Sequence, residues 1–210
     1  MTTLTLKSYQ QSALDALAAY ARAARIQGPA AAFAQHAGRA YNADAFGPDV
    51  PCVCLRIPTG GGKTVLAAHA VPLLATEWRG TDAPVAVWLV PSDTIRTQTL
   101  KALQTSGHPY REALEAVYGL GLRVCSLDDV AQVPAPQWGR QAVVIVVATI
   151  QSFRIDDAGQ RNVYSFTEAF EPHFKYALAQ GKGAEGGRDL ACLHARPDAV
   201  VTPEDVAQDS

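Results

Sequence analysis

The chain has 210 residues, of which 48% are hydrophobic, and its formal net charge is −2 at pH 7. This length can bury one domain, with or without insertions, and the balanced charge excludes an overall basic surface that would hold nucleic acid. The N-terminus lacks the apolar core of a secretory signal, and the longest apolar run, 142–148, is too short to cross a bilayer. We therefore expect a soluble, cytoplasmic protein without membrane contact.

The first part of the chain, 1–50, predicts an entry helix followed by an insertion. Apolar residues recur at helical spacing from Tyr9 to Ala24, and Ser8 with Gln11 matches a capping box. A Gly-Pro pair ends this helix, and the Ala-rich stretch 30–41 predicts a second, short helix.

Strand and helix patterns alternate after this insertion. Short apolar runs predict strands, and helical spacing predicts helices between them. The strands are expected at 52–57, 84–90, 122–127 and 141–148, and the helices at about 63–78, 93–103 and 111–117. Strands that are apolar at nearly every position are typical of a parallel sheet. The sequence therefore predicts an α/β fold with a parallel sheet and helices on both faces. The cysteines of the first strand are interpreted as reduced, buried thiols.

A glycine-rich loop joins the run 52–57 to the helix that follows. Residues 58–64 read Pro-Thr-Gly-Gly-Gly-Lys-Thr. A triphosphate requires many N–H donors aimed at one point, and glycines let the backbone approach without Cβ atoms in the way. The helix N-terminus adds its dipole and free amides. The candidate cofactor-binding residues of this loop are Thr59, Gly60, Gly61, Gly62, Lys63 and Thr64.

The last two residues of the loop carry the predicted chemistry. Lys63 can place its ammonium group on the β- and γ-phosphates, and Thr64 can offer its hydroxyl to Mg²⁺. We therefore predict Lys63 and Thr64 as catalytic residues and Thr64 as the metal ligand. The usual pattern G-x-x-x-x-G-K-S/T begins with a glycine where this chain has Ile57. The apolar run before the loop and the helix after it still give the context that the motif requires.

The loop resembles motif I of superfamily 2 helicases and translocases, and its triple glycine is more similar to the restriction-enzyme branch than to DEAD-box RNA helicases. Three other segments resemble motifs of that branch in the same order: the entry helix at 6–11, motif Ia at 87–100 and motif Ib at 144–153. From about residue 4 to 153 the chain resembles the helicase-type (Res) subunit of type III restriction enzymes. This resemblance implies a RecA-like P-loop NTPase domain with ATP and Mg²⁺ as cofactors. It also implies ATP hydrolysis coupled to movement on DNA, and a modification or specificity subunit as a partner.

The resemblance also implies roles for single residues. In that branch the glutamine after the tyrosine reads the adenine edge, which makes Gln10 the base reader here. Ser92 and Thr149 each follow a strand and can donate to the phosphates of single-stranded or duplex DNA, and Arg96 adds positive charge near Ser92. Without the resemblance, Ser92 fits a helix cap, Thr149 a turn residue and Gln10 a solvated helix residue.

Hydrolysis in this class also requires a carboxylate that holds Mg²⁺ through water and a glutamate that orients the attacking water. The resemblance implies a D-E-x-H motif after motif Ib, and no acidic pair of the sequence fits its order and spacing. We therefore expect 51–153 to be a partial motor domain, incomplete at its C-terminus. Residues 154–210 would be an insertion or irregular tail before the missing motif, and the chain a fragment of a longer enzyme.

Two other functions stay open. A non-catalytic motor remnant would bind nucleotide or nucleic acid without hydrolysis, and equal DNA binding with and without nucleotide would favour it. A small P-loop kinase would need an arginine-rich lid, for which 154–190 offers Arg154, Arg161 and Arg188. A kinase leaves the entry helix and the segment similar to motif Ia without a role.

Overall fold

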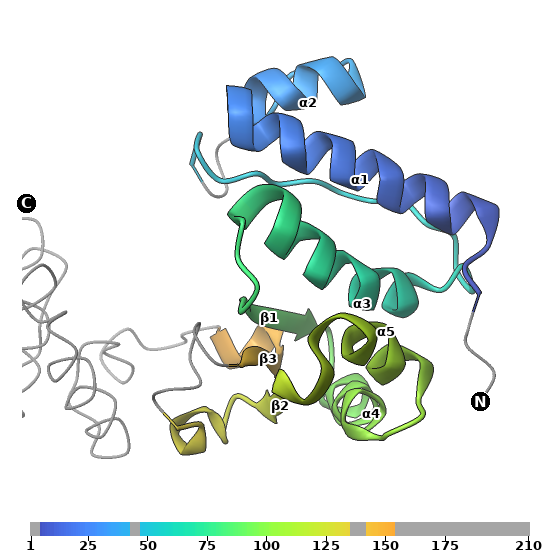
Figure 1. Cartoon of the computed structure of the whole chain (residues 1–210), viewed down its shortest axis with the longest axis vertical. Coiled ribbons are helices and arrows are strands. Elements are labelled where there is room, and N and C mark those ends of the chain that lie inside the picture. Colours follow the sequence, from blue (N-terminus) through green and yellow to red (C-terminus); the bar gives the residue numbers. More distant parts are fainter. Residues whose placement is uncertain (1–4, 43–46, 135–141, 154–210) are drawn as a thin grey trace, which may run out of the picture.

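The computed structural model describes residues 5–42, 47–134 and 142–153 (Figure 1). Within these ranges a parallel sheet has the strand order β1-β3-β2, built from β1 (Val85–Val90), β2 (Leu122–Ser126) and β3 (Val143–Thr149). Every residue of the central strand β3 is buried, as its continuous apolar sequence predicts. The sheet confirms the expected α/β fold. The segment 154–210 lies outside the described residues, and the division of the chain at 50 and 153 stays a prediction.

Helices α3 (Lys63–Leu74), α4 (Asp93–Gln104) and α5 (Pro109–Tyr118) pack on one face of the sheet. They share the main core with alternate residues of the strands. The buried members of this core are Ala68, Leu103, Leu114, Leu122, Val124, Val143, Ile145 and Val147. Because side chains alternate along a strand, Val144 and Val146 point to the opposite face, where they cluster beside the 3-10 turn η3 (Val130–Gln132). Among the described residues, helices cover the first face and a single turn covers part of the second.

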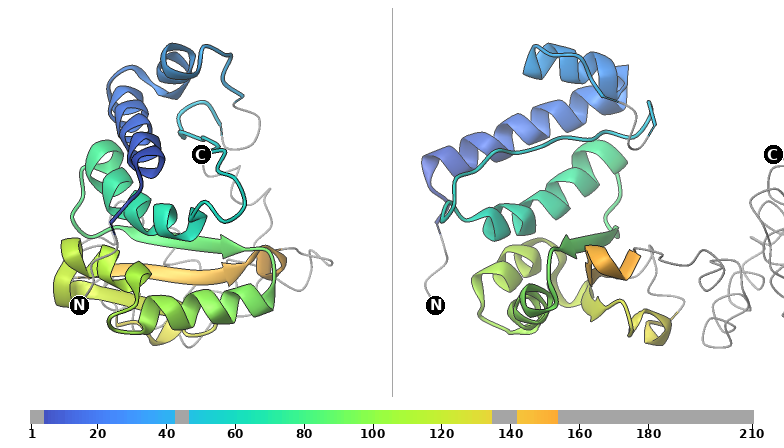
Figure 2. Two further views of the ribbon diagram at one scale, coloured as in Figure 1. Left: turned by 90° about the vertical axis from the view of Figure 1, so that its right-hand side faces the viewer. Right: turned by 180° about the vertical axis from the view of Figure 1, so that it is seen from behind.

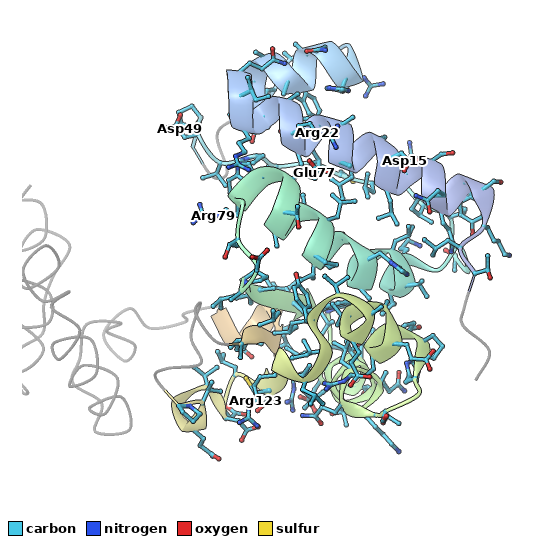
Figure 3. All side chains as sticks on the ribbon, in the orientation of Figure 1. Asp15, Arg22, Asp49, Glu77, Arg79 and Arg123 are labelled. Carbon is cyan, nitrogen blue, oxygen red and sulfur yellow. The ribbon has the colours of Figure 1, made fainter. Side chains whose placement is uncertain are left out.

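The N-terminal helix α1 (Ser8–Gln27) lies against α3 on the side away from the sheet, and α2 (Pro29–Ala37) packs on α1 (Figure 2). An ion pair ties α1 to η1 (Ala75–Arg79), a π-helical turn after α3. Arg22 donates to both carboxylate oxygens of Glu77, at 2.9 and 2.7 Å (Figure 3). The hydrogen bond from Arg22 lowers the pKa of Glu77.

Two helices differ in detail from the sequence prediction. The N-cap of α1 is Lys7 rather than Ser8, and Gln10 rather than Gln11 is the third helical residue. The shift follows from a hydrogen bond, because Gln10 Oε1 accepts the Lys7 N–H at 2.9 Å. Helix α3 continues past Pro72 to Leu74, and the π-helical turn η1 follows it directly.

The run 52–57 is not a strand, so this prediction was wrong. It pairs with no strand of the described part of the chain, and Cys52–Arg56 are exposed. An apolar run becomes a strand only when a neighbour satisfies its backbone. This run instead lies beside α1 and α2, where Val53–Leu55 border a pocket of about 140 Å³. The interpretation of its two cysteines as buried thiols was also wrong, because without a sheet around the run both Cys52 and Cys54 are exposed.

The edge strand β1 has an exposed apolar face. In the described sheet β1 pairs with β3 alone, and its residues Val85, Val87 and Leu89 are 47%, 55% and 49% exposed. A groove of about 520 Å³ separates this edge from α3 and η1, and most of its lining is aliphatic or aromatic. An edge strand of this kind, without a charged residue, is prone to pair with other chains.

Candidate nucleotide site

The three glycines of the loop are each required for a different reason. Gly60 has a φ of 78° and open space around it, so only its backbone conformation excludes other residues. A Cβ on Gly61 would lie 2.6 Å from Ile57 Cγ2 and 2.9 Å from the Pro58 carbonyl oxygen, so this position excludes a side chain by space. Gly62 combines both constraints, because its φ is 79° and a Cβ would lie 2.5 Å from Gln10 Nε2.

The loop leads directly into the N-terminus of α3. Gly62 is the N-cap, no side chain caps the helix, and its first turn has no acidic residue. The first bond of the helix runs from the Leu66 N–H to the Gly62 carbonyl at 3.0 Å. The amides between these two residues therefore have no partner inside the helix, and together with the dipole they favour an anion.

The two residues predicted to be catalytic lie at the start of α3. The Lys63 ammonium donates to the Pro58 carbonyl at 3.0 Å, and that carbonyl also accepts the Gly61 N–H at 3.0 Å. Lys63 is exposed, and its side chain folds back over the loop. Thr64 is half-buried on the first turn, and Thr59 is exposed at the loop entrance.

The start of α1 contacts the middle of the loop. Gln10 is only 7% exposed; its Nε2 donates to the Gly61 carbonyl at 2.9 Å and its Oε1 accepts the Lys7 N–H. The insertion between α1 and the loop therefore does not separate Gln10 from the glycines. The Tyr9 hydroxyl donates to the same Gly61 carbonyl at 2.9 Å. Sequence reasoning missed Tyr9, although its place directly before Gln10 in the entry-helix motif was a usable signal.

The residues predicted to contact nucleic acid meet at the carboxyl ends of β1 and β3, where Val90 is paired with Thr149. Ser92 caps α4 by accepting the Ile95 N–H at 3.4 Å. Thr149 is buried, and its hydroxyl shares a hydrogen bond of 2.9 Å with the Ser152 hydroxyl.

Two further contacts shape this second cluster. Arg96 forms an ion pair with Asp93 at 2.7 Å, one turn apart on α4. Gln151, which sequence reasoning missed, donates to the Pro91 carbonyl at 3.0 Å and ties the two loops together. Ser92 and Thr149 therefore lie at one edge of the sheet, held by local bonds.

The donor set fits Mg²⁺ that arrives with a nucleotide. No group of three or more histidine, cysteine or acidic residues could hold a metal ion in the described ranges. Mg²⁺ commonly keeps several waters and binds through substrate phosphates and a few protein oxygens, and the Thr64 hydroxyl can supply one of these. None of the described helices combines the length and hydrophobicity needed to cross a membrane.

The parallel sheet and the glycine loop at a helix N-terminus define the class of protein, an α/β fold of the P-loop type. The family model described as "Type III restriction enzyme, res subunit" matches residues 3–176. The chain belongs to this family, whose members are ATP-dependent, helicase-like hydrolases with a RecA-like P-loop fold. The resemblance found in the sequence is thus confirmed, and the match continues beyond residue 153. No curated protein and no solved structure matches the chain.

Proposed function

We propose that this chain is the ATP-binding part of a DNA helicase or translocase. The observation that carries the proposal is the glycine loop, which opens the uncapped N-terminus of α3 and is held by the entry helix α1. A charged triphosphate satisfies the free amides of this helix end better than any uncharged ligand would.

Each residue of the loop has a part in this proposal. The phosphates lie against the backbone of Gly60, Gly61 and Gly62, and the Lys63 ammonium exchanges the Pro58 carbonyl for phosphate oxygens. The Thr64 hydroxyl would hold Mg²⁺, and the ion would neutralise negative charge on the phosphates. Thr59 lines the entrance of the loop.

Gln10 can distinguish adenine from guanine through the side-chain N–H and the carbonyl lone pair that make no bond within the protein. One N–H of its amide and one lone pair of its carbonyl are already used by Gly61 and Lys7. One donor and one acceptor remain. Adenine offers N7 as acceptor and N6–H as donor along one edge, whereas guanine offers two acceptors there. The glutamine therefore complements adenine and leaves guanine with an unmatched oxygen.

The proposal assigns nucleotide binding to the described residues and leaves hydrolysis to groups outside them. Hydrolysis requires a carboxylate near the metal and a group that orients water. Among the described residues, no carboxylate is bonded to Lys63 or to the glycine loop. ATP turnover, movement on DNA and a modification subunit as partner are proposed from the family alone.

Substitution of Lys63 tests the proposal. Lys63→Ala removes a charge-assisted bond to phosphate, which contributes about 1.5–3 kcal/mol, so the Kd for ATP should rise by on the order of 10- to 100-fold. The Kd is measured by titration calorimetry with ATP and Mg²⁺. The control is Lys101→Ala, which removes an exposed lysine from α4 and should leave the Kd unchanged. Equal affinity of wild type and Lys63→Ala would refute a phosphate site at this loop.

The second cluster makes a separate prediction about DNA. Asp93 neutralises Arg96 at 2.7 Å, so Asp93→Asn should free the guanidinium and strengthen binding of single-stranded DNA. Arg96→Ala should weaken that binding and lower the salt slope by about 0.7. Fluorescence anisotropy across a salt series measures both effects. Arg22→Ala is the matched control, since it also removes one charge and one ion pair. The same change for Arg22 and Arg96 would attribute the effect to net charge.

A further inference from the structure

The Gly61 carbonyl is held by two donors from one helix. The Tyr9 hydroxyl and Gln10 Nε2 both donate to it at 2.9 Å, from adjacent residues of α1. A carbonyl oxygen has two lone pairs, so these two bonds use its full accepting capacity. Gly61 is buried, and the bonds connect parts of the chain that are 52 and 51 residues apart.

These two bonds fix the direction of the next amide. The peptide between Gly61 and Gly62 is planar and trans, so its C=O and its N–H point in opposite directions. When the carbonyl is directed toward α1, the Gly62 N–H is directed away from α1. Among all the residues that the structure describes, α1 included, no protein acceptor receives this N–H. It is therefore oriented before any ligand arrives.

We propose that Tyr9 is a positioning residue, whose hydroxyl holds the Gly61–Gly62 peptide in the orientation that binds phosphate. This inference rests on the proposed function of the loop. It assigns to Tyr9 a contribution to triphosphate affinity that does not depend on the base.

Tyr9 acts only on the peptide that binds phosphate, whereas Gln10 acts on this peptide and on the base. Gln10 holds the Gly61 carbonyl, joins the first turn of α1 through Lys7 and has bonding capacity left for adenine. The polar contact of the Tyr9 side chain is the Gly61 carbonyl, and its ring is largely outside the core, with 41% of the residue exposed. Loss of the Tyr9 hydroxyl should therefore affect all triphosphates equally, whereas loss of the Gln10 amide should also affect the choice of base.

The test compares Tyr9→Phe, which deletes a single oxygen, with the wild-type chain. Calorimetry gives the Kd for ATP, GTP and inorganic tripolyphosphate, each with Mg²⁺. Tyr9→Phe should raise all three values by the same factor, about 3- to 10-fold, as expected for one lost hydrogen bond. Gln10→Ala should in addition reduce the preference for ATP over GTP. Tyr110→Phe, which removes a hydroxyl from α5, should change none of the three values.

The outcomes separate this inference from the proposed function. If wild type binds ATP, Lys63→Ala binds it more weakly, and Tyr9→Phe binds like wild type, the positioning role is wrong and the proposed function stands. If wild type binds no triphosphate, both are wrong. A change for ATP but not for tripolyphosphate would also overturn the positioning role, since Tyr9 would then act on the base.

A second measurement covers the case in which Tyr9→Phe is unstable. In the wild-type chain, tripolyphosphate should slow amide exchange in residues 8–12, because a ligand on the Gly62 N–H stabilises the peptide that these residues hold. Unchanged exchange at this end of α1, with slowed exchange at the start of α3, would overturn the inference.

Discussion

Gly62→Ala should reduce nucleotide affinity more than Gly60→Ala does. A left-handed φ costs an alanine about 1–2 kcal/mol, and both Gly60 and Gly62 have such a φ. Gly62→Ala also places a methyl group 2.5 Å from Gln10 Nε2, which would push the amide off the Gly61 carbonyl. We expect a loss of about 10-fold for Gly60→Ala and on the order of 100-fold for Gly62→Ala.

Gly60→Ala is the control for Gly62→Ala. Both variants introduce the same strain, and only one introduces the clash, so the difference in Kd reports on Gln10. The double variant Gly62→Ala with Gln10→Ala removes the clashing group. Its loss should be smaller than the sum of the two single losses, as a coupled pair requires. Additive losses, or equal losses for Gly60→Ala and Gly62→Ala, would contradict the contact between Gly62 and Gln10.

Leu103→Ala should cause one of the largest losses of stability in the chain. Leu103 belongs to α4 and is fully buried against α5 and the sheet. Truncation of a leucine in such a core costs about 2–5 kcal/mol, because the cavity collapses only in part. The free energy of unfolding should fall by this amount, and it is measured by urea denaturation followed by circular dichroism.

Leu120 supplies the matched control for the core. It is fully exposed in the turn between α5 and β2, so Leu120→Ala makes the same chemical change without a cavity. Its effect should stay within about 0.5 kcal/mol. Similar losses for Leu103→Ala and Leu120→Ala would contradict the placement of α4 on the sheet.

Local patterns predicted most of the regular elements but not all of them. The apolar run at β3, the cap at Ser92 and the helical spacing of α1 depend on neighbours in the chain, and each lies close to where the sequence puts it. The resemblance predicted the family, because it rests on several motifs in a fixed order. Contacts between segments that are distant in the chain could not be predicted in this way.

Two cases show why. The run 52–57 has the composition of a strand. A strand also needs a neighbouring strand to satisfy its backbone, and the composition of the run does not show whether one is available. Tyr9 lies in the entry-helix motif, but the motif does not indicate its partner, because Gly61 is 52 residues away in the chain. The shift of the N-cap from Ser8 to Lys7 has the same origin, since Gln10 is fixed both by the helix start and by the distant loop.

Helix α1 connects the glycine loop to α2. Its 20 residues span about 30 Å at 1.5 Å per residue, with the Gly61 contacts at one end and α2 at the other. The ion pair of Arg22 with Glu77 lies about three-quarters of the way along the helix. Because α1 also packs along α3, one continuous helix mechanically connects the glycine loop with α2.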